Sequence, residues 1–221
     1  MRDQIKALAK DLLIQRGYRG VSFGDLASAL NTTRANIHYH FGNKQKLVSE
    51  VLNDYIKATL AEQKHVWGDP GARLVDRIGR TVEYSHRRYA KYNPPGKSGH
   101  PWSLIARMRQ DSDALTPKDR ASLRRFGEEL HGLIVAAIED AKARGEFVAT
   151  MPVQDVALQL VGVANSAGPI TQDAGNFDRL EQLYMGFARI IAQAFGTEKA
   201  AAAPKYHRRD HSEAHTHRTL P

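Results

Sequence analysis

Residues 25–41 read DLASALNTTRANIHYHF and carry two short helical patterns with a tight break between them. Asn31 falls in the break and suits the left-handed or turn conformation needed there. Thr33 can cap the second helix, in which Ile37 and Phe41 lie about one turn apart. About four residues separate the two patterns, so the stretch predicts a helix-turn-helix.

The flanking sequence predicts the remaining helices of a small N-terminal domain. Ser22 is a good N-cap for the first pattern, with Asp25 as the weaker partner of a capping box. An apolar stripe of helical spacing precedes it and stops at Gly17, and a longer apolar pattern opens at Leu47. We expect residues 1–46 to form a three-helix DNA-binding domain of the helix-turn-helix type.

The rest of the chain also shows helical periodicity, and no convincing strand pattern occurs. Residues 47–196 predict a larger helical domain, which makes the fold all-α with about nine helices. One of these helices is expected over 153–167, ending at Gly168–Pro169, and the last over 177–195. Residues 197–221 have no apolar periodicity and predict a disordered, basic, His-rich tail.

Composition excludes several classes of protein. The 221 residues include no cysteine, so neither a disulfide framework nor thiolate chemistry is possible. The N-terminus lacks the apolar core of a secretory signal, and no stretch is apolar enough for a membrane span. The net charge of +8 favours polyanionic partners, and residues 1–60 contribute nine Lys or Arg against five Asp or Glu.

His38 and His40 raise the possibility of a metal site. On a helix these two side chains point roughly 200° apart, so they cannot bind one ion together. In the tail, His207, His211 and His215 are spaced so that a helix would align them, but the tail has little to fold against. We therefore expect no metal site and no cofactor.

A helix lying in a DNA groove accounts better for residues 34–41. With Ile37 and Phe41 facing inward, the other side chains face outward or flank that surface, and none is acidic. Arginine pairs with guanine and asparagine with adenine, while histidine, tyrosine and lysine can donate to phosphate. The predicted DNA-binding residues are Thr33, Arg34, Ala35, Asn36, His38, Tyr39, His40 and Lys44.

The stretch GYRGVSFGDLASALNTTRANIHYHFGNKQKL, residues 17–47, resembles the DNA-binding domain of the TetR family of bacterial transcriptional regulators. The resemblance covers about the first 50 residues in order, spacing and turns. The remainder matches in architecture alone, which implies that residues 47–196 form a helical ligand-binding and dimerisation domain. Asn31 stands where the family often has glycine. His38 and His40 stand where tyrosines are usual, which suggests operator binding that depends mildly on pH.

The resemblance implies a cytoplasmic, nucleoid-associated homodimeric repressor, released from a palindromic double-stranded operator by a small organic effector. The helices over 153–167 and 177–195 are the candidate dimer contacts, although both could instead be buried within their own domain. The candidate effector-binding residues lie between positions 71 and 165. They are Tyr84, Trp102, Met108, His131 and Asn165.

Two other functions compete with this one. An enzyme is disfavoured because the sequence has no Gly-x-Ser-x-Gly, no phosphate-binding glycine loop, no HExxH and no convincing carboxylate pair, so no catalytic residue is expected. The main alternative is a helical protein-interaction module without sequence-specific DNA binding. Arg34, Asn36, Tyr39 and Lys44 argue together against it.

Overall fold

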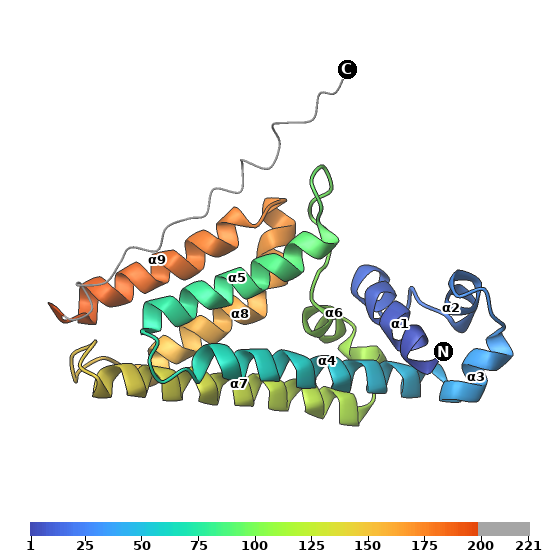
Figure 1. Cartoon of the computed structure of the whole chain (residues 1–221), viewed down its shortest axis with the longest axis horizontal. Coiled ribbons are helices and arrows are strands. Elements are labelled where there is room, and N and C mark those ends of the chain that lie inside the picture. Colours follow the sequence, from blue (N-terminus) through green and yellow to red (C-terminus); the bar gives the residue numbers. More distant parts are fainter. Residues whose placement is uncertain (199–221) are drawn as a thin grey trace, which may run out of the picture.

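The computed structural model describes residues 1–198, and that part of the chain is all-helical (Figure 1). It holds nine α-helices and one 3-10 turn, as the sequence predicts. The helices are α1 Arg2–Arg16, α2 Phe23–Ala29, α3 Arg34–Phe41, α4 Lys44–Trp67, α5 Leu74–Tyr92, α6 Leu104–Gln110, α7 Pro117–Ala143, α8 Val153–Ala174 and α9 Asp178–Phe195, with the 3-10 turn at Ser112–Ala114. Within residues 1–198, no helix is long and apolar enough to cross a membrane.

The helices form a small head and a larger bundle joined by α4. Helices α1, α2 and α3 cluster at one end of the molecule, where α4 begins (Figure 1). Helix α4 then runs along α7 for most of its length, and α8, α9 and α5 complete the bundle through the contacts α7–α8, α8–α9 and α5–α9. Helix α4 contacts both α1 in the head and α7 in the bundle, so it connects the two parts directly.

The predicted helix-turn-helix forms as expected, and its local signals act as predicted. Ser22 and Asp25 make the capping box: the Asp25 N–H donates to Ser22 Oγ at 3.2 Å, and the Ser22 N–H donates to Asp25 Oδ2 at 2.7 Å. Thr33 Oγ1 caps α3 by accepting from the Asn36 N–H at 3.1 Å. Asn31 adopts a left-handed φ of 50° in the turn.

The expected end of a helix at Gly168–Pro169 is wrong. Helix α8 runs through both residues and ends at Ala174, followed by Gly175 with a φ of 66°. Pro169 has no N–H, so the carbonyl of Asn165 loses its helical donor. Burial offsets this cost, because Gly168 is buried and a Cβ there would lie 3.4 Å from the Cβ of Ala106 on α6.

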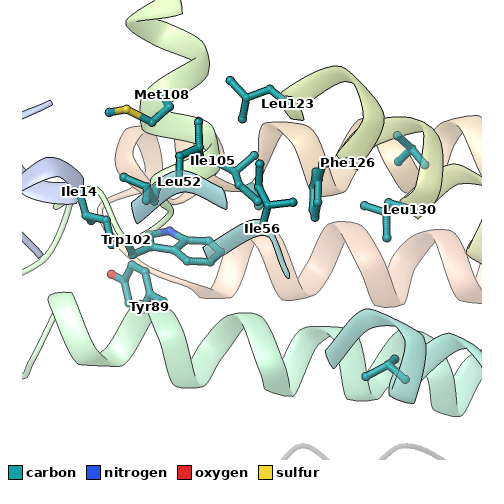
Figure 2. Packing of buried hydrophobic residues seen from close by; sticks show 14 of the residues in the cluster. Ile14, Leu52, Ile56, Tyr89, Trp102, Ile105, Met108, Leu123, Phe126 and Leu130 are labelled. Atoms are coloured by element: carbon teal, nitrogen blue, oxygen red, sulfur yellow. The ribbon is translucent and has the colours of Figure 1, made fainter. Parts of the chain in front are cut away.

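A single hydrophobic cluster runs from Ile5 in α1 to Ile191 in α9. Figure 2 shows its middle, where Ile14 of α1 and Leu52 of α4 lie in the same region as the Trp102 indole. The cluster therefore crosses the expected domain boundary between residues 46 and 47, and the head and the bundle share apolar packing.

The chain immediately after α9 is held in place. The Thr197 N–H donates to the carbonyl of Glu146 at 3.0 Å, and Thr197 Oγ1 donates to the carbonyl of Gly145 at 2.6 Å. The disordered tail predicted from residue 197 thus begins with an anchored residue. The remainder of that prediction, including the spaced histidines, concerns residues 199–221 and lies outside the described residues.

Candidate nucleic-acid interface and effector cavity

Helix α3 presents the surface that the sequence predicts. Ile37 and Phe41 are fully buried, whereas Tyr39 is 85% exposed and lies at the centre of the outward face. Ala35 is also exposed and leaves room for close approach of a groove. Because no residue of α3 is acidic, this face adds no charge that would repel phosphate.

Arg34 and Asn36 are both oriented by their neighbours. The Arg34 guanidinium lies against the backbone of Gly24 in α2, where a Cβ would come within 2.8 Å of Arg34 Nη2. The Asn36 amide donates from Nδ2 to Thr32 Oγ1 at 2.9 Å. Bidentate recognition of adenine uses the amide oxygen and one amide N–H, and the second N–H can keep its bond to Thr32.

His38 has a defined hydrogen-bonding state. Its Nδ1 lies 2.9 Å from the carbonyl oxygen of Gly42, and its ring packs edge-on against Phe23 at 4.7 Å between centroids. A carbonyl oxygen only accepts, so Nδ1 carries a hydrogen. Nε2 therefore accepts when the ring is neutral and donates only when the ring is protonated.

His40 is half-buried and packs edge-on against Tyr39, with centroids 5.4 Å apart, while its backbone carbonyl accepts from Arg2. In residues 1–198, no three His, Cys, Asp or Glu side chains are grouped in an arrangement that could hold a metal ion.

Lys44 begins α4 and is held over the ring of Tyr18, with Nζ 4.4 Å from the ring centroid. Burial lowers the pKa of Lys44, and the charges of Asp25 and Asp111 oppose that shift. The ammonium group thus lies where the loop after α1 meets the start of α4.

A contact between α6 and the head was not predicted. The Tyr18 N–H donates to Asp111 Oδ2 at 2.8 Å, just beyond the C-terminal end of α6. Gly17 allows this approach, because a Cβ there would lie 2.5 Å from Asp111 Oδ2. The partners are 93 residues apart, so no local pattern could have revealed them. The contact ties α6 to the loop that supports Lys44.

A cavity of about 80 Å³ lies between α4, α5, α6, α7, α8 and α9. Tyr84, Trp102 and Asn165, three of the five predicted effector contacts, line it. Met108 and His131 do not: Met108 is fully buried in the hydrophobic cluster (Figure 2), and His131 lies half-buried on α7. The sequence reasoning missed two arginines in the lining, Arg88 and Arg109.

The cavity walls are fixed by hydrogen bonds from within the protein. The Trp102 indole N–H donates to Thr171 Oγ1 at 2.8 Å, beyond the proline in α8. Tyr55 OH accepts from the N–H of Leu104 at 3.1 Å, which joins α4 to the start of α6. Trp102 therefore offers a ligand its ring rather than its N–H, and a ligand that moves α6 also acts on α4.

Comparison with known proteins agrees with this geometry. Residues 5–51 match the family model described as bacterial regulatory proteins of the tetR family. This match covers the helix-turn-helix head of the chain, helices α1 to α3 and the start of α4. The HTH-type transcriptional regulator QacR of Staphylococcus aureus is 34% identical over 53 residues, which cover 24% of this chain and 28% of QacR. The HTH-type transcriptional repressor KstR2 of Mycolicibacterium smegmatis is 22% identical over 102 residues, which cover 43% of this chain and 50% of KstR2.

The chain thus spans half or less of the length of the two curated relatives in these matches. Its whole fold is similar to that of a TetR-family regulator from Agrobacterium tumefaciens. The TM-score is 0.72 at 19% identity, covering 89% of this chain and 97% of the other. The sequence likeness therefore lies mainly in the head, whereas the likeness of fold extends through the bundle.

Proposed function

We propose that the chain is a non-enzymatic, homodimeric DNA-binding repressor of the bacterial cytoplasm, released from a palindromic operator by a small-molecule effector. The surface of α3 carries this proposal: exposed Tyr39 and Arg34 lie on a face without acidic residues, in a head that matches the TetR family. An interaction module without DNA binding does not require this combination of residues. Residues 1–46 would form the DNA-binding unit and residues 47–196 the effector and dimer unit.

The exposed apolar side chains of α8 and α9 support a dimer. Leu158 is 60% exposed on α8, and Leu183 and Ile190 are 42% and 61% exposed on α9. Leu183 and Ile190 are seven residues apart and share one helical face. Two such helices from each subunit would form a four-helix interface around a two-fold axis. The two α3 helices would then enter major grooves about 34–36 Å apart.

A matched pair of variants tests the dimer. Ile190→Asp places a charge in the proposed interface and should yield monomers that bind the operator much more weakly. Gln182→Asp makes an exposed α9 position acidic about 80° around the helix and should leave the dimer intact. Analytical ultracentrifugation measures both, and a fully dimeric Ile190→Asp variant would refute the interface.

Effector binding would act by shifting the population of head positions. Helix α4 contacts α1 and α3 in the head and α5, α6 and α7 in the bundle. Asp111 provides a second connection through its bond to the Tyr18 N–H. An effector that displaces α6 in the cavity would move both connections and separate the two α3 helices from successive grooves.

Selection of genomic fragments tests DNA binding directly. Wild-type protein should enrich a palindromic sequence from its own genome. Ala35→Glu adds an acid to the exposed face of α3 and should abolish enrichment, since it opposes phosphate and fills the space for groove approach. Ala61→Glu makes the same change at an exposed site on α4 and should enrich as wild type does. Equal enrichment by the two variants, or none by wild type, would refute the proposal.

A further inference from the structure

Two arginines in the cavity wall differ from Arg77 and Arg144, two other arginines of the bundle. Arg77, which is 1% exposed, pairs with Asp140, and Arg144 pairs with Asp140 and Glu146. Among the described residues, Arg88 and Arg109 have no carboxylate partner, although both are partly buried and their hydrogen bonds go to neutral side chains. An arginine withdrawn from water without a counter-charge is unfavourable, which calls for a reason to keep it there.

The neutral contacts of these arginines hold them at the cavity. The Arg88 guanidinium donates to Tyr84 OH and lies 4.4 Å from the centroid of the Tyr55 ring. Arg109 donates to Asn165 Oδ1 and lies 5.9 Å from the centroid of the Phe126 ring. Hydroxyl, amide and ring faces orient a guanidinium without neutralising it, so both positive charges remain available to a ligand.

The charged side chains that line the cavity within residues 1–198 are both arginines. No Asp or Glu of this part of the chain lines it, and aromatic rings form much of its wall. Burial lowers the pKa of Arg88 to about 10 and also lowers the pKa of Arg109, so the protein leaves both charges poorly solvated. An anion entering the cavity would supply the missing counter-charge in a weakly screened environment, where charge-assisted hydrogen bonds are strong.

We propose that the effector is a small organic acid whose carboxylate binds Arg88, with Arg109 as a second cation and the apolar body of the acid against Trp102 and Phe126. The planar guanidinium of arginine matches a carboxylate with two parallel hydrogen bonds. A cavity of about 80 Å³ has room for roughly five to eight water-sized groups, which suits a short-chain or single-ring acid. This assignment rests on the proposed effector-controlled repressor and names the class of ligand for it.

A neighbouring cleft offers a competing site for anions. It lies between α1, α4 and α5, has a volume of about 490 Å³, and shares Arg88 with the cavity. Two of its other cations are already paired, Lys6 with Asp54 and Lys91 with Asp11. Arg87 lines only the cleft, so replacing Arg87 or Arg109 separates the two sites.

The test uses full-length protein with butyrate, hexanoate and benzoate as probes, each compared with its amide. Binding is measured by calorimetry and by quenching of tryptophan fluorescence, because Trp102 lines the cavity. The best acid should bind at least tenfold more tightly than its amide. Arg88→Gln and Arg109→Gln should each weaken acid binding about tenfold or more while leaving amide binding unchanged, and Arg87→Gln should behave as wild type. Arg88→Lys, which retains a charge, should restore part of the affinity and serves if Arg88→Gln fails to fold.

The outcomes separate this inference from the proposed function. Acid binding lost in Arg87→Gln but kept in Arg109→Gln would place the anion in the cleft and overturn the assignment. Equal binding of acids and amides, or no acid binding, would also overturn it, even if the protein binds its operator. Acid binding with the expected variant pattern, in a protein that enriches no DNA, would support the cavity chemistry and refute the repressor.

Discussion

Protonation of His38 should strengthen operator binding, because only the charged ring can donate to a phosphate. Nδ1 is already committed to the Gly42 carbonyl at 2.9 Å, so the neutral ring presents an accepting Nε2 to the DNA. Imidazole groups change charge around neutral pH. Binding that requires the protonated ring takes up a proton, so operator affinity falls as pH rises.

The size of the effect follows from one contact per subunit. A hydrogen bond from a charged donor contributes about 1.5–3 kcal/mol, so each contact is worth about tenfold or more in affinity. Each phosphate neutralised also adds about 0.9 to the slope of log affinity against log salt. For a dimer, the slope should therefore be steeper by about 1.8 at low pH than at high pH.

Fluorescence anisotropy on a labelled operator, at several salt concentrations and pH values, measures both quantities. His38→Gln should remove the pH dependence and the change in slope. His40→Gln should retain them, because His40 is half-buried and packs on Tyr39. A wild-type profile that is flat with pH, or one that His38→Gln leaves unchanged, would refute the reasoning.

Three further variants test the head. Arg34→Ala should weaken operator binding by about 1–3 kcal/mol and relax specificity at one base position, as measured on a panel of operator mutants; an equal loss on every sequence would assign Arg34 to phosphate. Lys44→Ala should weaken binding to all sequences and lower the salt slope by about 1 per contact, whereas an unchanged slope would exclude a phosphate contact. Hydrogen bonds from Ser22 to the Asp25 carboxylate lower the pKa of Asp25. Ionised Asp25 therefore stabilises the fold above pH about 4, and this stabilisation is lost as pH falls further. Asp25→Asn should therefore lower the Tm at pH 7 and approach the wild-type Tm near pH 3, and a constant difference across pH would contradict this account.

Sequence reasoning succeeded where short-range chemistry decides the structure. The caps at Ser22 and Thr33 and the left-handed Asn31 are local choices, and each forms as predicted. It failed at Pro169, because the packing that keeps α8 helical comes from other parts of the chain. A proline is a strong local signal, but tertiary burial can offset its cost.

The same contrast between local and long-range determinants applies to the predicted sites. The outward face of α3 follows from helical spacing, so its residues could be named in advance. The cavity gathers residues from six helices, and a pattern of aromatic and polar residues found Trp102 there but also chose Met108, which is packed in the core. Arg88 and Arg109 could not be recognised from the sequence. Whether an arginine has a carboxylate partner depends on which residues the fold brings next to it.

The shared hydrophobic cluster has a practical consequence for engineered sensors that combine the head of one regulator with the bundle of another. A junction between residues 46 and 47 would divide the chain at a point where the folded head and bundle share one hydrophobic cluster. Ile14 would face a foreign surface in place of the packing around Trp102, and Tyr18 would lose Asp111 as its acceptor. A functional chimaera therefore has to carry α6 with the head, or redesign the α6 surface to match its new neighbour.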